Sequence, residues 1–352
     1  MFITALGTAA PEQRYTKLDC LRAFETSDFS ARLGARSRRV VETVLTSDNG
    51  MDARHLAVDS LKDVFDIDPD TLHARFLHAA PALAHRAAVK ALKQAGLACA
   101  QIDAVVVSTC TGYLCPGLSG YVIEKLGLRS GVQAFDLVGQ GCAAALPNLQ
   151  LANALLASGQ AGHVLSVCVE VCSAAMYLDD DPGVLISACL FGDGAGAAVL
   201  SRTPDGEGRR MEWLESESCI DPQRRQALQF ETRRGMLRNV LTRQVPQLAA
   251  ESAHQVFQSV SRRSHVAATD ITAWIFHAGG RDVLLALQKK FMLLPQDLRH
   301  SAAMLRCYGN ISSPFVYFVL QEALRDQNPG GAWWLSSFGA GFSCYGALLT
   351  VQ

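Results

Sequence analysis

The 352-residue sequence lacks several features that would assign it to a common class of protein. It has no run of 18 or more uninterrupted apolar residues, which excludes a membrane-spanning helix. Its start, MFITALGTAAPEQ, has neither the basic segment nor the long apolar stretch of a signal peptide. It also lacks a basic surplus, since 32 Lys and Arg stand against 33 Asp and Glu. We therefore expect a cytoplasmic protein with no membrane span and no nucleic-acid partner.

Cysteine is abundant, with 11 residues, but the spacing that would bind a structural metal is absent. No two cysteines form a Cys-x-x-Cys pair, so we expect no metal site. An odd number of cysteines without a secretion signal argues against a disulfide framework. Most are expected to be small core residues, as Cys168 and Cys189 in apolar stretches are, and at least one is a candidate nucleophile.

Hydrophobic residues make up 49 % of the chain, and they alternate between helical and strand patterns. The segment from Pro81 to Gly96 predicts a helix, with proline near its start and glycine at its end, and residues 104–108 predict a buried strand. This alternation is typical of an α/β fold. A polar stretch with proline and glycine, residues 201–210, is the candidate boundary between an N-terminal half, 1–205, and a C-terminal half, 206–352.

The second half repeats the order of elements of the first. When Cys142 is placed on Asn310, the predicted helices that follow them coincide. The strand that ends at Ser108 then falls one residue from the strand that ends at His277, and two further elements agree in order and type. Such a repeat favours a duplicated α/β unit, with the two halves packed as one five-layered αβαβα body.

The duplication singles out Cys142, His277 and Asn310. Cys142 follows Gln-Gly at a predicted helix start, where the helix dipole and unpaired N–H groups favour a thiolate. His277 ends an apolar strand before Ala-Gly-Gly, so its ring can reach into a cleft. Asn310 opens the matching helix, and its amide can donate to an oxyanion without ionising. Each residue alone has an ordinary structural explanation, but their joint placement at element ends favours a nucleophilic site.

Two other patterns have competing explanations. A cluster of arginines is either a solvated helix face or a collar for the phosphates of a nucleotide-like carrier, because arginine matches phosphate oxygens with a planar fork. Residues 192–197 fit the loose G-x-G-x-x-A dinucleotide pattern, but they precede a strand instead of opening a helix, so no dinucleotide site is expected. The clustered arginines are Arg32, Arg36, Arg38 and Arg39.

Four segments resemble the type III polyketide synthases, the chalcone and stilbene synthase-like enzymes. They are VGQGCAAA around Cys142, LFGDGAGAA from Leu190, IFHAGG around His277 and YGNISS around Asn310. The resemblance covers nearly the whole chain in the right order. It implies a thiolase fold, a homodimer, CoA thioesters as substrates and no cofactor. It also implies a Cys142–His277–Asn310 triad in which the cysteine carries the acyl group.

The resemblance also implies the residues of a substrate pocket. Phe191 matches the gatekeeper aromatic between the CoA tunnel and the reaction chamber, and a second gatekeeper position falls on Asn239. The position contributed across the dimer falls on Cys115, and the arginine cluster is expected to bind CoA. The family's Gly-Phe-Gly-Pro-Gly loop appears as SFGAG, residues 337–341. The remaining pocket positions are Cys110, Thr111, Cys172, Ala175 and Ser312.

The reaction implied is iterative decarboxylative condensation of malonyl-CoA onto an acyl-CoA starter held on Cys142, followed by cyclisation to a pyrone or resorcinol. Thr111 and Cys172 resemble the pair that lines an acyl tunnel in bacterial alkylpyrone and alkylresorcinol synthases, which favours a medium or long fatty acyl starter. Cys110 instead resembles the extra cysteine of malonyl-primed tetrahydroxynaphthalene synthases, and a bulky Phe230 at the chamber floor would favour that alternative. A single-round β-ketoacyl synthase is a third alternative. The acyl group could arrive either on CoA or on a carrier protein.

Overall fold

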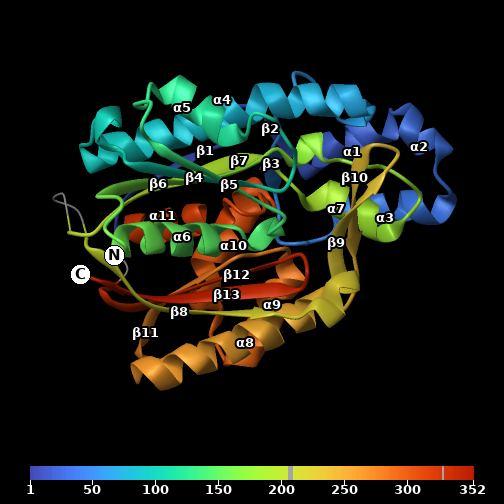
Figure 1. The fold of residues 1–352 in the computed structure, drawn as a ribbon. Coiled ribbons are helices and arrows are strands. Elements are labelled where there is room, and N and C mark those ends of the chain that lie inside the picture. Colours follow the sequence, from blue (N-terminus) through green and yellow to red (C-terminus); the bar gives the residue numbers. More distant parts are fainter. Residues whose placement is uncertain (205–208, 327–328) are drawn as a thin grey trace.

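The computed structural model describes residues 1–204, 209–326 and 329–352. Figure 1 shows five layers, in which helices lie outside and between two layers of strands. The predicted αβαβα arrangement of an α/β fold is confirmed. The outer helices are α4 (Pro69–Ala95) and α5 (Leu118–Leu126) on one side and α8 (Val245–Ser264) and α9 (Arg281–Phe291) on the other, and the central ones are α6 (Ala145–Ala157), α10 (Arg299–Tyr308) and α11 (Phe315–Arg325).

The strands of both layers form one continuous nine-stranded sheet, and β1 connects the two layers. It pairs along most of its length with β7 and through its first two residues with β8. The predicted boundary, residues 201–210, lies between β7 and β8, and its residues 205–208 are outside the described ones. The order is β11 (Ile271–Phe276), β12 (Gly331–Gly339), β13 (Ser343–Val351), β8 (Met211–Ile220), β1 (Phe2–Ala9), β7 (Gly194–Ser201), β6 (His163–Glu170), β4 (Ala104–Thr109) and β5 (Gln133–Val138).

Several shorter elements gather at one end of the layers, on the right in Figure 1. Among them, β9 and β10 form a two-stranded sheet of their own, separate from the nine-stranded one. Its two-residue turn, Arg234-Gly235, has φ of 52° and 76°, as a tight hairpin turn requires. These elements are α1 (Lys17–Glu25), α2 (Asp28–Arg32), α3 (Ala35–Thr46), α7 (Pro182–Leu190), β2 (Arg14–Thr16), β3 (Ala53–His55), β9 (Leu228–Arg233) and β10 (Met236–Leu241).

The helix predicted to start at Pro81 starts earlier, so that prediction is wrong at its N-terminus. Asp68 caps α4 by accepting from two backbone N–H groups of the first turn, and Pro81 lies inside the helix. A proline in a helix interior removes a hydrogen bond, but the buried face on both sides of Pro81 packs on β1 and compensates for this loss. The predicted end is confirmed, since Gly96 has φ 67°. No helix in the described part of the chain is long and apolar enough to cross a membrane.

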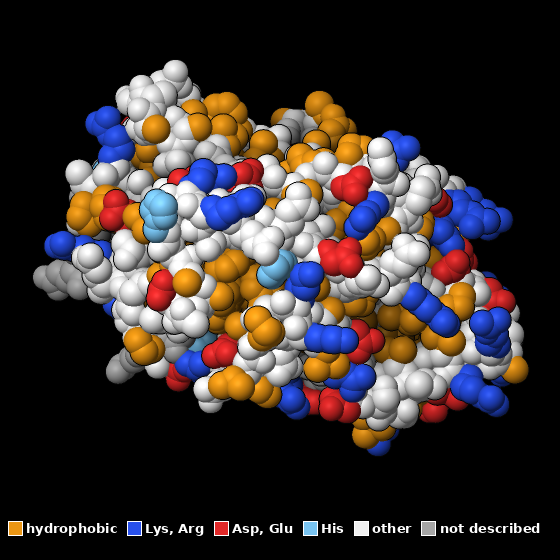
Figure 2. Space-filling view, turned by 90° about the horizontal axis from the view of Figure 1, so that it is seen from below, with side chains coloured by type: hydrophobic (Ala, Val, Ile, Leu, Met, Phe, Trp, Pro, Cys, Tyr) orange, Lys and Arg blue, Asp and Glu red, His pale blue; other side chains and the backbone are white. Residues whose placement is uncertain are grey.

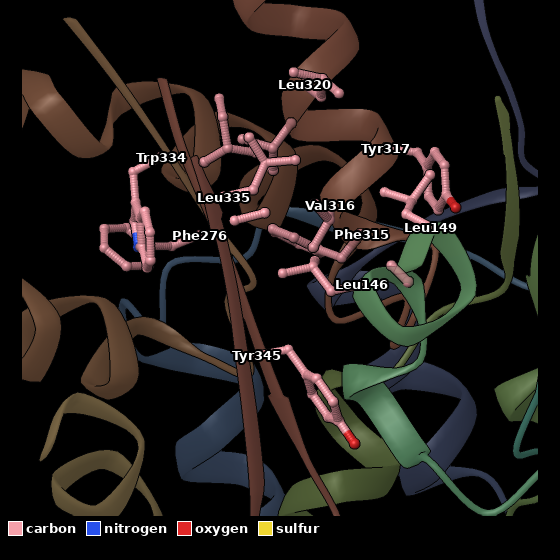
Figure 3. Close-up of a cluster of buried hydrophobic side chains, with 14 of the residues drawn as sticks. Leu146, Leu149, Phe276, Phe315, Val316, Tyr317, Leu320, Trp334, Leu335 and Tyr345 are labelled. Carbon is pink, nitrogen blue, oxygen red and sulfur yellow. The ribbon is translucent and has the colours of Figure 1, made fainter. Parts of the chain in front are cut away.

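The largest hydrophobic cluster fills the space between the sheet layers, extends to the outer helix α8 and contains residues from both predicted halves. Figure 3 shows side chains of the central helix α11 packed between β11 and β12 on one side and α6 on the other. This core places the end of β11, the start of α6 and the loop before α11 close together. Its labelled residues are Leu146, Leu149, Phe276, Phe315, Val316, Tyr317, Leu320, Trp334, Leu335 and Tyr345.

Candidate active site

Cys142 lies in a single 3₁₀ turn, Gly141–Ala143, that precedes α6. Gly141 has φ 55°, and a Cβ there would lie 2.9 Å from the backbone nitrogen of Ala340. A Cβ on Gly339 would likewise lie 2.6 Å from the nitrogen of Ala143. Glycine at both positions therefore lets the loop after β12 close against the turn that carries Cys142.

The structure brings Cys142, His277 and Asn310 onto the wall of one cavity of about 560 Å³, which we call the entry cavity. His277 directly follows β11, and its N–H donates to the carbonyl of Ser336 on β12 at 2.9 Å. Asn310 does not open a helix as predicted, because α11 begins at Phe315. Instead, Asn310 forms an isolated bridge to Phe191, and this bridge aims its amide at the histidine.

The ring of His277 is buried and held from two sides. Phe315 and Phe338 contact it edge-on, with ring centroids 5.5 and 5.0 Å away. The N–H of Ser312 donates to Asn310 Oδ1, so this oxygen faces His277 Nε2 at 3.3 Å and the ring nitrogen donates to it. Nδ1 has no partner within the described residues. Burial lowers the pKa of His277 to about 4, so the ring is neutral and keeps one nitrogen free to accept a proton.

The thiol of Cys142 accepts a hydrogen bond from Ser312 Oγ at 3.2 Å. Ser312 has φ 56°, a backbone conformation that residues other than glycine rarely adopt. Burial nonetheless raises the pKa of Cys142 to about 12. Desolvation of the sulfur therefore opposes the thiolate that the helix start favours. The neutral His277 lies on the same cavity wall, where a base for this thiol is expected.

A buried carboxylate beside the site, Glu170 at the end of β6, was missed by the sequence analysis. It accepts from the N–H of Cys110 and the hydroxyl of Thr111, both at 2.9 Å, and from Ser313 Oγ at 2.6 Å. Burial raises its pKa, and these donors oppose the rise. Glu170 thus ties the loop after β4 to the loop after Asn310. A charged residue that ends the apolar run HVLSVCVE was the available signal.

A second cavity, the chamber, encloses only about 30 Å³. Phe191, Asn239 and Ser187 line both this chamber and the entry cavity, so they form the constriction between the two. Phe230 also lines the chamber, and its side chain lines a third cavity of about 750 Å³ as well. Predicted pocket residues on the chamber wall are Thr111, Cys172, Ala175 and Ser312.

Two predicted pocket cysteines lie elsewhere. Cys110 lines the third cavity, and its thiol donates to Glu170 Oε1 at 3.3 Å. Cys115 is exposed and is not among the residues that line the three cavities. A contribution of Cys115 across a dimer stays a prediction.

The four clustered arginines lie on or next to α2 and α3 and are exposed, and none of them lines the entry cavity. Arg243 and Arg281 line it instead, and both are exposed, so the cavity reaches the surface beside them. Arg243 makes no side-chain hydrogen bond or ion pair within the described part of the chain. Figure 2 shows the face seen from below, where hollows with hydrophobic floors are rimmed by charged side chains.

The site offers a thiol, a neutral imidazole and an amide on one wall, which are the groups needed for acyl transfer through a covalent thioester. No cluster of three or more His, Cys, Asp or Glu side chains suited to a metal ion occurs among the residues that the structure describes. The pattern at residues 192–197 leads into β7, as the sequence predicts, so it lacks a helix N-terminus for a dinucleotide phosphate.

Two families match the chain. Residues 38–263 match the FAE1/Type III polyketide synthase-like proteins, and residues 215–350 match the C-terminal domain of chalcone and stilbene synthases. A 3,5-dihydroxyphenylacetyl-CoA synthase of Streptomyces toyocaensis is 29 % identical over 361 residues, which cover 99 % of this chain and 89 % of that protein. The enzyme of the same name from Amycolatopsis orientalis is 32 % identical over 271 residues, which cover 75 % and 72 %.

Solved structures agree in fold. PKS-I of the brown alga Ectocarpus siliculosus superposes with a TM-score of 0.90 at 23 % identity, over 99 % of this chain and 97 % of that one. The 1,3,6,8-tetrahydroxynaphthalene synthase of Streptomyces coelicolor A3(2) superposes with a TM-score of 0.87 at 24 % identity, over 100 % and 99 %. From these matches, the chain belongs to the type III polyketide synthase family and is an acyltransferase with the thiolase fold.

Proposed function

We propose that this enzyme condenses malonyl-CoA units iteratively on a short acyl starter held by Cys142, and that malonyl-CoA itself is the preferred starter. The observation that carries the catalytic part is the shared cavity wall of Cys142, His277 and Asn310. The observation that carries the starter is the small chamber beyond it. A homodimer, a cytoplasmic location and CoA rather than a carrier protein as the acyl donor belong to the same proposal.

The first step is transfer of the starter from CoA to the enzyme. The Cys142 sulfur attacks the thioester carbonyl while His277 takes its proton, so no isolated thiolate has to form in the buried site. The histidine then returns the proton to the departing CoA thiolate. A new thioester on Cys142 replaces the old one, and free CoA leaves through the entry cavity.

The second step is decarboxylation of malonyl-CoA. Loss of CO₂ leaves an electron pair that becomes an enolate on the thioester carbonyl. Asn310 Nδ2 has only a long contact, 3.4 Å to the carbonyl of Gly279, so it is free to donate to this oxygen. The Nε2–H of His277 makes only a long bond, 3.3 Å, to Asn310 Oδ1, so it can turn to the enolate oxygen as a second donor. The enolate carbon attacks the Cys142 thioester, which lengthens the chain by two carbons, and transfer back to Cys142 starts the next round.

The starter follows from the volume of the chamber. About 30 Å³ holds roughly two water molecules, far less than a fatty acyl chain. Thr111 and Cys172 do lie on the wall, as a fatty acyl tunnel would need, but Phe230 lies there too. The names of the two matched relatives and of the Streptomyces coelicolor enzyme denote aromatic products without an alkyl chain, which supports the same proposal.

A medium or long fatty acyl starter is the second candidate. It is favoured by one observation, that Thr111 and Phe230 line both the chamber and the third cavity of about 750 Å³. An acyl chain that displaced the ring of Phe230 would gain this space. Each buried CH₂ would then stabilise binding by about 0.8 kcal/mol.

We expect wild-type enzyme to form product from malonyl-CoA alone. Decanoyl-CoA should be at least about tenfold less efficient as a starter, because failure to bury one or two of its CH₂ groups already weakens binding by about that factor. Phe230→Ala should raise the kcat/KM for decanoyl-CoA, because it opens the wall to the third cavity. Mass spectrometry of products from a panel of starters measures both. If wild type prefers decanoyl-CoA, the second candidate replaces the first, and Cys172→Phe should then block long starters while sparing hexanoyl-CoA.

A further prediction concerns the CoA phosphates. Arg243→Gln is expected to raise the KM for malonyl-CoA about 3- to 10-fold, because an unpaired arginine at the cavity mouth can pair with a phosphate. N-acetylcysteamine thioesters lack those phosphates and should be nearly unaffected. Arg36→Gln and Arg38→Gln test the sequence-based assignment in the same assay. If only these two variants change the KM for CoA substrates, the α3 arginines bind CoA and Arg243 does not.

A further inference from the structure

The proposed reaction needs more room than the chamber holds. A chain of several ketide units is far larger than the two waters that fit in about 30 Å³. The entry cavity of about 560 Å³ around Cys142 can hold part of this chain, but growth past the constriction into the chamber requires one wall to move. The chamber walls that follow β4 and β6 and precede α11 are tied together through Glu170. The walls that could move are therefore α7 and the β9–β10 hairpin.

The α7 side of the constriction is fixed at its C-terminal end. Arg54, a buried residue of β3, donates to the carbonyls of Ala188 and Phe191. These bonds hold the backbone that carries the gatekeeper position Phe191. The same arginine satisfies carbonyls at the end of α7 that would otherwise lack donors. The C-terminal end of α7 is thus anchored to the body of the protein.

The hairpin is the less constrained wall. It supplies Phe230 and Asn239 to the chamber, yet its strands do not pair with the nine-stranded sheet, and its base is held by a backbone bond from the Gly341 N–H to the Leu228 carbonyl at 3.1 Å. An isolated two-stranded hairpin is marginally stable in water, so its position depends on side-chain contacts. Asn239 Nδ2 donates to Ser187 Oγ on α7 at 2.8 Å, and a Cβ on Gly183 would lie 2.9 Å from the carbonyl of Leu241.

Arg238, next to Asn239 on β10, makes the strongest of these contacts. Its side chain is only 12 % exposed and faces three carboxylates. Nε lies 3.1 Å from Asp179, and a terminal nitrogen lies 3.0 Å from Asp181, both on the segment just before α7. The other terminal nitrogen lies 3.6 Å from Glu231 on β9. Asp181 also caps α7 by accepting from Gly183 and Val184. One guanidinium therefore joins both hairpin strands to the start of α7.

We propose that Arg238 is a positioning residue that latches the β9–β10 hairpin onto α7, and that release of this latch enlarges the chamber and sets how many malonyl units are added. This inference rests on the proposed function. The three pairs join the hairpin to the segment before α7 around a guanidinium that is only 12 % exposed. They are also reversible, because Asp181 and Glu231 are each 47 % exposed and water can replace the arginine.

The test compares Arg238→Gln with Arg233→Gln. Arg233 is the matched control, because it lies on the same hairpin and pairs with the same Asp179, but at 3.6 Å and 55 % exposed. We expect Arg238→Gln to shift the product distribution toward chains with at least one more malonyl unit and to accept hexanoyl-CoA about 5-fold better, with malonyl-CoA decarboxylation retained. Arg233→Gln should resemble wild type. Mass spectrometry of products gives the distribution.

A second measurement varies the salt concentration. Salt screens partly exposed ion pairs. The wild-type products should therefore contain more malonyl units as the NaCl concentration rises from roughly 0.05 M to about 1 M, the range over which screening becomes strong. Arg238→Gln should show no such salt response. Arg238→Lys, which keeps the charge but not the planar fork, should fall between the two. Unchanged products at high salt in wild type, or equal products from Arg238→Gln and Arg233→Gln, would overturn the latch. Absence of malonyl-CoA decarboxylation in wild type would instead overturn the proposed function.

Discussion

Cys142→Ala is expected to abolish acyl-enzyme formation and lower product formation by more than about 10³-fold, the scale on which removal of a covalent nucleophile acts. The reason is geometric, because Cys142 lies on the same cavity wall as His277 and Asn310. Incubation with a labelled acyl-CoA followed by peptide mass spectrometry locates the acyl group. Cys142→Ser should also fail to form product but should keep malonyl-CoA decarboxylation, since the thiol is not needed for loss of CO₂.

The matched controls are Cys110→Ala and Cys172→Ala. Cys172 is buried and Cys110 is half-buried, and desolvation raises the pKa of each well above its usual value. Neither lines the entry cavity, so both variants should keep the acyl label on Cys142. Stable label on Cys110 or Cys172 in the Cys142→Ala variant would show that the nucleophile has been assigned to the wrong thiol.

His277→Ala and Asn310→Ala are each expected to slow malonyl-CoA decarboxylation by roughly 100-fold or more, the range for loss of one oxyanion donor. The two side chains contact each other at 3.3 Å, so their effects should not add fully. Release of CO₂ from labelled malonyl-CoA measures this half-reaction without a starter. An unchanged rate in both variants would remove these residues from the decarboxylation step.

Two further variants separate a lost donor from a disturbed fold. Asn310→Asp keeps the size of the side chain and the acceptor for the Ser312 N–H, but it replaces the Nδ2 donor with a negative charge. It should therefore be at least as slow as Asn310→Ala. Asn49→Ala removes an amide from the wall of the same cavity, where its bonds go to Val44 and Met51, and should leave decarboxylation nearly unchanged.

Much of the architecture could be predicted from the sequence because it depends on local patterns. The apolar run at residues 104–108 predicts the buried strand β4, which spans Ala104–Thr109. Gly141 before Cys142 predicts the sharp turn that presents the cysteine. Histidine and asparagine at corresponding places in the repeat then predict a shared site. The prediction is wrong at Pro81 because the cost of a proline inside α4 is offset by burial of the helix, which a short stretch of sequence does not reveal.

The sequence by itself determined the order of elements, the duplicated α/β unit and the three residues of the candidate site. Only the tertiary structure decided three other properties. These are the neutral state of Cys142 and His277, the 30 Å³ chamber closed by Phe230, and the presence of Arg243 rather than the α3 arginines on the entry cavity. The physical reason is that hydrogen-bonding and hydrophobic patterns act between near neighbours in the chain. Desolvation, cavity volume and charge pairing depend instead on distances between residues far apart in sequence, which folding alone sets.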